Sequence, residues 1–367
     1  MVVSESEAAA AIEAFGLTMM SLQPQAGGHI NASWRVATPG GDSYLLQRLN
    51  PRVFPDGEAV TRNVALVATH LWDLVDGQPD AERRVLRLRA RADGSVAWVA
   101  GDGACWRVFH FIDRSRTCLR ATTALQAQEV GRAFGQFQRM LQSYAGPPLV
   151  ETIPGFHDTA GRLATLERTV AGDPAGRAAS VAAEIGFAHS RADYAKVLPP
   201  LLAAGALPIR IVHNDAKAAN VLLDAASGEA LAVIDLDTVM PGTLLSDVGD
   251  LIRSIASPTD EDERDLARIG VRPPLLAALA AGFLGACGAG LTEAERTHFI
   301  FAGLLLTYEQ GVRFLTDHLA GDSYYRTSRP GQNLDRARAQ FRLLESLEAE
   351  RSALEAMVDR TLHTRQG

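Results

Sequence analysis

Short apolar runs separated by turn-forming residues fill the first hundred positions, which is the pattern of an antiparallel sheet. Residues 33–38 and 44–49 predict two paired strands, and three further runs predict a meander: 84–89, 96–100 and 105–112. Arginine alternates with apolar residues in the first of these three runs, which predicts a strand with one solvated face. Between the two groups, residues 55–74 carry valines and a leucine at helical spacing, so the region predicts a small sheet-based lobe with one helix.

Helical spacing dominates from residue 122 onward. Apolar side chains trace one face of a helix over residues 130–144, and Thr292 with Glu295 forms a capping box that predicts the start of a helix through residue 306. Residues 275–291 carry no charge but fall short of the ~20 residues that a membrane span requires, so a buried helix is expected. The charged run 335–350 predicts a largely solvated helix. We expect an α+β fold of two lobes, residues 1–110 and 111–367.

Composition narrows the functional classes. The 367 residues are 47% hydrophobic and 22% charged, with a net charge of −7 that argues against a nucleic-acid partner. The three cysteines lack metal or disulfide spacing, which indicates a reducing compartment. The first residues lack a basic stretch before an apolar core, so they are not expected to be a signal peptide. Ser4 and Glu7 have the spacing of a capping box, which predicts the start of a helix there. We therefore expect a cytoplasmic protein without a membrane partner.

One segment carries most of the chemistry. Asp215 is followed five positions later by Asn220, and Asp235 comes after two short apolar runs. These runs are separated by a polar segment containing Ser227-Gly228, which predicts a hairpin that brings Asn220 and Asp235 to its open end. An amide oxygen and a carboxylate suit Mg²⁺, which binds few protein oxygens together with phosphate oxygens. Asp215 is then placed to orient a hydroxyl and accept its proton, and this pattern indicates phosphoryl transfer.

The neighbours of these residues have plainer explanations as well. Lys217 could reach the same phosphate as a point charge. His213 is expected to brace the loop and to take no part in the chemistry. Asp237 could assist the metal or cap the next turn, and the cap is slightly favoured. Taken singly, each Asp or Asn in the segment is most often a turn or cap residue, so the functional interpretation depends on their combined spacing.

A second candidate segment lies between an expected first strand and residues 33–38. Gly27 and Gly28 permit close approach of the backbone, and exposed N–H groups there can bind phosphate. His29 and Asn31 could contact either the phosphates or the acceptor. The alternative is a plain Gly-Gly turn.

His213-x-Asp215-x4-Asn220 followed by Ile-Asp235 resembles the aminoglycoside phosphotransferase and choline kinase superfamily, and a closer likeness is to the N-acetylhexosamine 1-kinases. The similar segments keep their order along nearly the whole chain: Gly27-Gly-His-Ile-Asn31, Leu45-Leu-Gln-Arg-Leu-Asn50, Glu151-Thr-Ile-Pro-Gly-Phe-His157, His213-Asn-Asp-Ala-Lys217, Val233-Ile-Asp-Leu-Asp-Thr-Val-Met-Pro-Gly242 and Pro330-Gly-Gln-Asn-Leu-Asp335. The resemblance implies a two-lobed, protein-kinase-like fold with a hinge near residues 109–113 that pairs with adenine.

The resemblance also implies roles for residues outside the central motif. The superfamily has a phosphate-binding Lys on the strand where this chain has Arg48, whose acidic partner the sequence leaves open. Asp247 is similar to an Asp that hydrogen-bonds back onto the catalytic loop, although a helix cap is the commoner use of such a residue. Arg313 and Tyr324 match an Arg and a Tyr that face the sugar. The alternative for Arg313 is an ion pair with Glu309 on the helix surface.

The expected function is an ATP- and Mg²⁺-dependent kinase that phosphorylates the anomeric hydroxyl of an N-acetylhexosamine. Another small-molecule alcohol kinase, for an aminoglycoside, choline or homoserine, is the alternative. A cationic acceptor would call for carboxylates or an aromatic cage, whereas residues 313–329 are poor in acids. A non-catalytic nucleotide-binding module is less expected, because Asp215, Asn220 and Asp235 are all present.

Overall fold

The computed structural model of the chain describes residues 4–25 and 30–363, which belong to two compact units. The first unit, here called the sheet unit, comprises three segments of the chain: Met1–Thr117, Met140–Pro154 and Val221–Pro241. The second, called the helical unit, comprises Cys118–Arg139, Gly155–Asn220 and Gly242–Gly367. Each unit is therefore assembled from stretches that are distant in the sequence.

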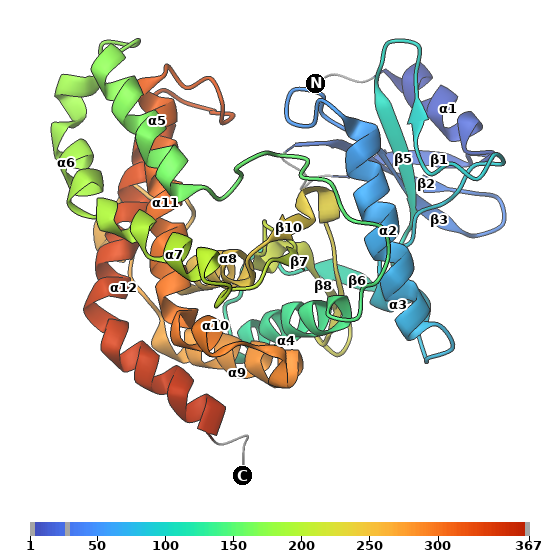
Figure 1. Ribbon diagram of the computed structural model, residues 1–367. Helices are drawn as coiled ribbons and strands as arrows, with labels where there is room; N and C mark the ends of the chain where they lie inside the picture. Colours follow the sequence, from blue (N-terminus) through green and yellow to red (C-terminus); the bar gives the residue numbers. More distant parts are fainter. Residues whose placement is uncertain (1–3, 26–29, 364–367) are drawn as a thin grey trace. The chain divides into compact units, whose positions relative to one another are not determined.

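A five-stranded antiparallel sheet forms the centre of the sheet unit (Figure 1). Its order is β1-β2-β3-β5-β4, with the bounds Ser21–Pro24, Ala32–Ala37, Ser43–Arg48, Cys105–His110 and Trp98–Val99. Tyr44 and Leu46 of β3 point to the same face as Trp106 of β5, where they pack against apolar residues of α1 (Glu5–Ala14). The predicted strands at 33–38, 44–49 and 105–112 are thus confirmed.

The other face of the sheet lies against α2 (Gly57–Val75), where Val60 packs with Cys105. The Asp56 side chain caps this helix by accepting from the backbone N–H of Ala59 at 2.9 Å. Val60, Val64, Val67 and Leu71 are buried, as their spacing predicts. The unit also has a smaller antiparallel sheet with the order β6-β8-β9 (Ser115–Thr117, Val221–Asp224 and Ala230–Val233). Its remaining elements are the short helix α3 (Ala81–Arg84), the turn η4 (Leu236–Thr238) and the start of β10 (Met240–Gly242).

Helices make up nearly all of the helical unit. In chain order its elements are α4 (Ala124–Leu141, which ends just beyond the unit), α5 (Thr159–Gly172), η1 (Ala178–Val181), α6 (Ala182–Ser190), η2 (Ala192–Lys196), α7 (Leu198–Ala203), β7 (Arg210–Val212), η3 (Ala218–Asn220), α8 (Leu244–Ala256), η5 (Leu266–Arg268), α9 (Pro273–Cys287), η6 (Gly288–Gly290), α10 (Glu293–Thr297), α11 (Phe299–Leu319) and α12 (Gln332–His363). The long helices α11 and α12 lie side by side (Figure 1).

Close contact between α8 and α11 depends on two glycines. A Cβ atom at Gly249 would lie 2.5 Å from the carbonyl oxygen of Ala302, and one at Gly303 would lie 2.4 Å from Ile252. Both distances are far below van der Waals contact, so only glycine lets the two helices approach this closely. The crossing fixes the polar residues of α8 relative to those of α11.

Three predictions about these elements need correction. Residues 84–89 do not form a strand, apart from a single bridge at Leu88, and Arg83 is buried in an ion pair with Asp224 at 2.7 Å. The predicted helix 292–306 is interrupted at His298, between α10 and α11. Helix α12 is not largely solvated, because an apolar stripe is buried along it: Ala337, Phe341, Leu344 and Leu347. In the charged run, acidic and basic residues hid this 3.6-residue periodicity.

Two helix predictions are confirmed. Both capping boxes form, at Ser4 with Glu7 and at Thr292 with Glu295. The uncharged stretch at 275–291 includes α9, whose leucines and phenylalanine are buried. Within the described residues, no helix is long and apolar enough to cross a membrane.

Candidate active site

The loop between β7 and β8 holds Asp215 beside two of the predicted site residues. The ammonium of Lys217 donates to Asp215 Oδ2 at 2.6 Å. Asn220 Nδ2 donates to the same carboxylate oxygen at 3.1 Å and to the carbonyl oxygen of Asp215 at 2.8 Å. The structure therefore brings Asp215, Lys217 and Asn220 together within one loop.

Two opposing influences act on the pKa of Asp215. Burial raises it, but the nearby Lys217 ammonium and the hydrogen bonds from Lys217 and Asn220 lower it more, so the pKa lies below its usual value. The carboxylate is then anionic at neutral pH. An anionic carboxylate can accept a hydrogen bond from a hydroxyl group, which is what the orientation of an alcohol acceptor requires.

The carboxylate of Asp247, on α8, binds the backbone of this loop. Its carboxylate accepts from the backbone N–H groups of His213 at 2.9 Å and Asn214 at 2.7 Å, and from Gln138 Nε2 at 2.7 Å. The predicted hydrogen bonding onto the catalytic loop is confirmed. The alternative use as a helix cap is wrong, because α8 begins one turn earlier, after Thr243. Burial raises the pKa of Asp247 despite these donors.

His213 contributes to the loop through packing. Its side chain is completely buried, and its ring makes edge contacts with Phe134 at 5.4 Å and Phe137 at 6.0 Å between centroids. Its Nδ1 accepts from the backbone N–H of Asp215 at 3.3 Å. These contacts match the bracing role expected from the sequence.

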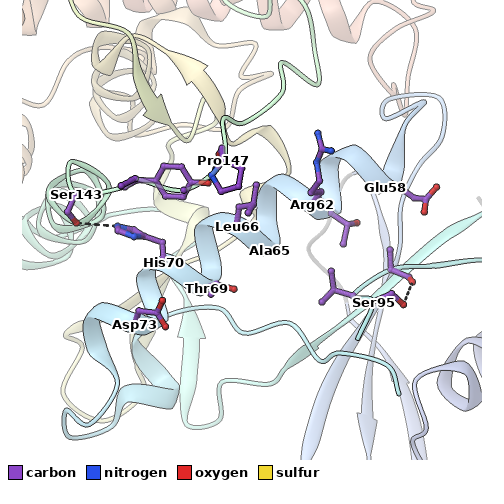
Figure 2. Close-up of a pocket in the computed structure, with 16 residues that line it drawn as sticks. Glu58, Arg62, Ala65, Leu66, Thr69, His70, Asp73, Ser95, Ser143 and Pro147 are labelled. Carbon is purple, nitrogen blue, oxygen red and sulfur yellow. Dashed lines mark hydrogen bonds between the residues drawn. The ribbon is translucent and has the colours of Figure 1, made fainter. Parts of the chain in front are cut away.

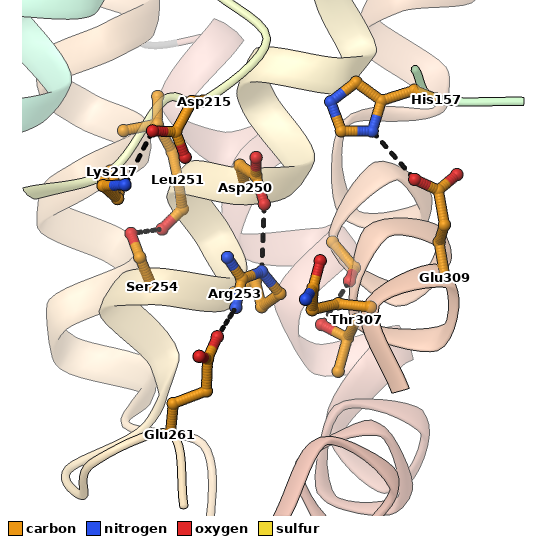
Figure 3. A network of polar contacts seen from close by, with 12 residues as sticks. His157, Asp215, Lys217, Asp250, Leu251, Arg253, Ser254, Glu261, Thr307 and Glu309 are labelled. Atoms are coloured by element: carbon orange, nitrogen blue, oxygen red, sulfur yellow. Dashed lines mark hydrogen bonds and ion pairs between the residues drawn. The ribbon is translucent and has the colours of Figure 1, made fainter. Parts of the chain in front are cut away.

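A buried histidine–glutamate pair holds the same loop from the other side (Figure 3). His157 Nδ1 lies 2.9 Å from Glu309 Oε1 of α11, and His157 Nε2 lies 2.9 Å from the carbonyl oxygen of Asn214. The Thr159 hydroxyl donates to the second oxygen of Glu309 at 2.6 Å. The alternative for Arg313, an ion pair with Glu309 on the helix surface, is wrong, because Glu309 is only 1% exposed and pairs with His157.

The sequence offered a partial signal for this pair. His157 ends one of the segments that are similar to the sugar kinases, but nothing near it in the sequence indicates a partner. Glu309 lies 152 positions later. Only the packing of α11 brings the two side chains together.

A series of ion pairs lies near the Asp215 loop in the helical unit. Arg253 contacts Asp250 at 2.9 Å and Glu261 at 3.1 Å (Figure 3). Burial lowers the pKa of Arg253, but the neighbouring carboxylates, Asp215 among them, outweigh this and raise it. The negative charges of Asp250 and Glu261 are thus both paired with the Arg253 guanidinium.

Arg313 lies on α11, one turn beyond Glu309. Its guanidinium packs over the rings of Phe156 at 5.2 Å and Tyr325 at 5.7 Å, and donates to Gln310 Oε1 at 3.2 Å. Tyr324 is 63% exposed and contacts the ring of Tyr325 edge-on at 4.8 Å. Of the two tyrosines, Tyr325 is therefore the one that packs on Arg313, and the sugar-facing roles of Arg313 and Tyr324 stay predictions.

Asp317 organises the loop that carries both tyrosines. Its carboxylate accepts from three consecutive backbone N–H groups, those of Ser323, Tyr324 and Tyr325, at 2.8 to 2.9 Å. Asn333 Nδ2 donates to it as well, at 2.8 Å. Asp317 therefore fixes the backbone on which Tyr324 and Tyr325 are displayed.

The predicted hairpin is present in the sheet unit. Val221 of β8 pairs with Val233 of β9, and Gly228 in the connecting turn has φ +77°. The register puts the residues that precede β8 and those that follow β9 at the same end. Asp235 follows there with φ +63°, a left-handed conformation that is uncommon for a residue with a side chain. Its role as a metal ligand stays a prediction.

The Asp237 side chain is not a simple turn cap, because it bonds to residues of the large sheet and of the segment before β2. Its carboxylate forms a buried ion pair with Arg107 of β5 and accepts from Asn31 Nδ2. Gln47 Oε1 accepts from Arg107 Nη2 at 2.8 Å and from Nε at 3.1 Å. The network connects β3, β5 and the start of β2 with the turn η4 that follows Asp235. Sequence reasoning missed Arg107, which looks like any strand arginine until the register is known.

Arg48 points to the opposite face of the sheet. It pairs across the strands with Trp106, whereas Gln47 pairs with Arg107. Because neighbouring residues on a strand face opposite sides, Arg48 lies on the α1 side, away from Asp237. Its acidic partners, open in the sequence, are Asp102 at 3.2 Å and Glu7 at 4.0 Å. The predictions for Gly27, Gly28 and His29 fall outside the described residues.

A separate pocket of about 740 Å³ lies along α2 in the sheet unit (Figure 2). Figure 2 shows His70 beside Ser143, and the His70 ring also contacts the carbonyl oxygen of Met140 at 2.9 Å. None of the predicted catalytic, metal or acceptor residues lines this pocket. It is therefore not part of the candidate active site.

The donors present suit a hard cation that keeps phosphate oxygens among its ligands. No group of three or more His, Cys, Asp or Glu side chains that could hold a metal occurs among the described residues. Because Asn220 Nδ2 donates to two oxygens of Asp215, the orientation of the amide is set and its Oδ1 points the other way. An amide oxygen and a carboxylate are the kinds of ligand that Mg²⁺ takes when a nucleotide supplies the remaining ones, so Asn220 and Asp235 stay the predicted metal ligands.

Comparisons with known proteins bear on the family and the fold. The profile described as "Phosphotransferase enzyme family" matches residues 21–291. Among solved structures, an amicoumacin kinase in complex with AMP-PNP, Ca²⁺ and Ami is 14% identical, with a TM-score of 0.65 over 95% of this chain and 94% of that chain. An aminoglycoside phosphotransferase from Alicyclobacillus acidocaldarius is 16% identical, with a TM-score of 0.64 over 98% and 97%.

A third similar structure is a microcompartment-associated aminopropanol kinase, 14% identical with a TM-score of 0.59 over 96% of this chain and 99% of that chain. At such identities these three structures bear on the fold alone. They confirm the predicted kinase-like fold, with an antiparallel-sheet region and a helical region. The closer likeness to N-acetylhexosamine 1-kinases stays a prediction.

Proposed function

We propose that this chain, which belongs to the phosphotransferase enzyme family, transfers the γ-phosphoryl group of ATP to the anomeric hydroxyl of an N-acetylhexosamine. The observation that carries the proposal is the setting of Asp215. Its carboxylate is anionic, contacts Lys217 and Asn220, and sits on a loop held by Asp247 and His157. A rigid carboxylate of this kind can position an alcohol for attack on phosphorus.

Asp215 has a defined part in the reaction. It accepts the hydrogen bond of the acceptor hydroxyl and takes its proton as the hydroxyl oxygen forms a bond to the γ-phosphorus. The bond from that phosphorus to the bridging oxygen breaks, and ADP leaves with the electron pair. A low pKa makes Asp215 a weak base, which suits an anomeric hydroxyl because it is more acidic than an ordinary alcohol. Lys217 is placed to move from Asp215 to a phosphate oxygen as charge develops.

Asn220 and Asp235 would hold Mg²⁺, which neutralises charge on the phosphates when it is bound. Asn220 would contribute its amide oxygen, and the hydrogen bonds from its Nδ2 to Asp215 support that orientation of the amide. Asp235 contributes a carboxylate at a backbone position with φ +63°. Gly27, Gly28, His29 and Asn31 belong to the proposed nucleotide-binding segment by their sequence.

The charge balance near Asp215 supports a neutral acceptor. Near Asp215, among the described residues of the helical unit, four carboxylates already contact a cation: Asp215 contacts Lys217, Asp250 and Glu261 both contact Arg253, and Glu309 contacts His157. Asp247 is engaged by three N–H donors instead. An amine-bearing acceptor would need a carboxylate that is not already paired. Arg313, with the exposed Tyr324 and the packed Tyr325 beside it, instead offers donors and an aromatic surface that suit a sugar.

A screen of ATP consumption tests the proposal. The purified protein is assayed against N-acetylhexosamines, neutral sugars, choline, small amino alcohols and aminoglycosides at equal concentration. We expect an N-acetylhexosamine to give the highest kcat/KM. Turnover confined to amine-bearing acceptors would contradict the proposal and favour an amino alcohol or aminoglycoside kinase of the same family.

A further inference from the structure

The contacts of His157 define where its protons are. Nε2 lies 2.9 Å from the carbonyl oxygen of Asn214, and a carbonyl can only accept, so Nε2 carries a hydrogen. Nδ1 lies 2.9 Å from Glu309 Oε1, and this contact also requires a proton between the two atoms. The pair therefore holds one proton in addition to the one on Nε2.

We propose that His157 and Glu309 act as a single-proton brace, which positions Asp215 through the Asn214 carbonyl and ties the catalytic loop to α11. His157 is thus a positioning residue, and its effect on turnover rests on the proposed phosphotransfer at Asp215. The brace also joins two parts of the site, because α11 carries Arg313 one turn beyond Glu309. A shift of the acceptor-recognition helix would be passed to the catalytic carboxylate through this contact.

The brace acts on the backbone of Asn214. Asn214 has φ +63°, a conformation that costs free energy for a residue with a side chain and persists only when its surroundings hold it. The surroundings here hold it on both sides, since its N–H donates to Asp247 and its carbonyl accepts from His157. Loss of either contact would let the peptide next to Asp215 rotate. A misplacement of about 1 Å at a reacting group can cost roughly a hundredfold in rate.

Charged groups on the neighbouring elements favour the protonated pair. Burial lowers the pKa of His157, but the Glu309 carboxylate, with a smaller contribution from Asp250 of α8, raises it above its usual value. Burial raises the pKa of Glu309, but His157 and, to a smaller extent, Arg313 of α11 and the Thr159 hydroxyl of α5 lower it below its usual value. The stabilisation by the charged imidazolium is present at low pH and is lost as the pH rises through the raised pKa.

The proton itself can be observed by NMR of the full chain with ¹⁵N-labelled histidine, across a pH series. We expect one histidine with both ring nitrogens protonated well above the ordinary pKa of about 6.5. This signal should be absent in His157→Gln and unchanged in His189→Gln, the same substitution at an exposed position of α6. Glu309→Gln keeps a hydrogen-bonding partner but removes the charge, so His157 should then titrate below about 6.5. A His157 that titrates as an ordinary histidine would overturn the proposal.

Kinetics with the best acceptor of the unmodified protein test the positioning role. We expect His157→Gln to lower kcat by about tenfold to a hundredfold with little change in the KM for ATP. Glu309→Gln should move the alkaline limb of the kcat–pH profile to lower pH, because the pKa of His157 falls. His189→Gln should give the same profile as the unmodified protein. Equal kcat in His157→Gln and the unmodified protein would overturn the proposal. Absence of turnover with every N-acetylhexosamine would count against the proposed function, while the NMR series would still decide whether the brace exists.

Discussion

The guanidinium of Arg107 and the carboxylate of Asp237 form an ion pair inside the sheet unit, with side chains only 1% and 4% exposed. The pair joins the inner strand β5 to the turn η4, which begins directly after Asp235. Asn31 and Gln47 complete the hydrogen bonding of the two groups. A buried pair with this geometry fixes the direction in which the chain leaves Asp235.

Removing one partner of this pair should be costly. We expect Arg107→Met to lower the free energy of unfolding by about 3–5 kcal/mol, because it leaves the Asp237 carboxylate buried without its cation. Arg48→Met is the matched control on the neighbouring strand. Arg48 pairs with Asp102, which is 52% exposed, so the loss there should be about 1 kcal/mol or less. Denaturant titration measures both variants, and equal losses would show that the buried pair has no special weight.

The same strand geometry leads to a prediction about nucleotide binding. The Arg48 side chain lies on the α1 face of the sheet and is engaged by Asp102 and Glu7. We therefore expect Arg48→Ala to leave the KM for ATP nearly unchanged in steady-state kinetics. A clear rise in that KM would restore Arg48 as the phosphate-binding cation that its position in the sequence suggested. Otherwise Lys217 and the Gly27-Gly28 segment remain the candidates.

Substitution of Asp215 and substitution of Asp235 should affect different steps of the reaction. Asp215→Asn should lower kcat and leave nucleotide affinity nearly intact, because Asp215 acts on the acceptor. Asp235→Asn should also weaken Mg²⁺–ATP binding, because it removes the proposed metal carboxylate. Nucleotide titration of both variants, at several Mg²⁺ concentrations, separates the two roles. If both variants lost nucleotide affinity to the same extent, the assignment of roles would be wrong.

The pH profile reports on the Lys217–Asp215 contact. Activity that needs the Asp215 carboxylate is present above its folded pKa and is lost as the pH falls through it. Lys217→Met removes the nearest cation and leaves burial, which raises the pKa, so the acid limb of kcat/KM should move to higher pH. Lys196→Met serves as the control, because Lys196 pairs with Asp193 on the surface. An acid limb at the same pH in the unmodified protein and in Lys217→Met would contradict this account.

Local signals explain which features the sequence predicted well. The hairpin after Asn220 follows from two apolar runs and a Ser-Gly turn, all within residues 221–234. The two capping boxes also depend on residues three positions apart. Asp215, Lys217 and Asn220 lie in one loop, so their contact could be inferred from spacing alone.

Features that depend on contacts distant in the sequence were missed. The run around Arg83 looks like a solvated strand, but Arg83 pairs with Asp224, 141 positions away. His157 meets Glu309 and Arg107 meets Asp237 across separations of 152 and 130 positions. Nothing in the local composition distinguishes a buried arginine or histidine from an exposed one, because its partner is supplied by the tertiary structure.

The most direct test of the central claim compares a free reducing N-acetylhexosamine with its methyl glycoside. The two differ only at the anomeric oxygen, where the glycoside has no proton to give to Asp215 and no free hydroxyl to attack phosphorus. With ATP and Mg²⁺, we predict turnover of the reducing sugar to a 1-phosphate and no turnover of the glycoside. Equal phosphorylation of both would contradict phosphotransfer at the anomeric position and would assign the reaction to another hydroxyl.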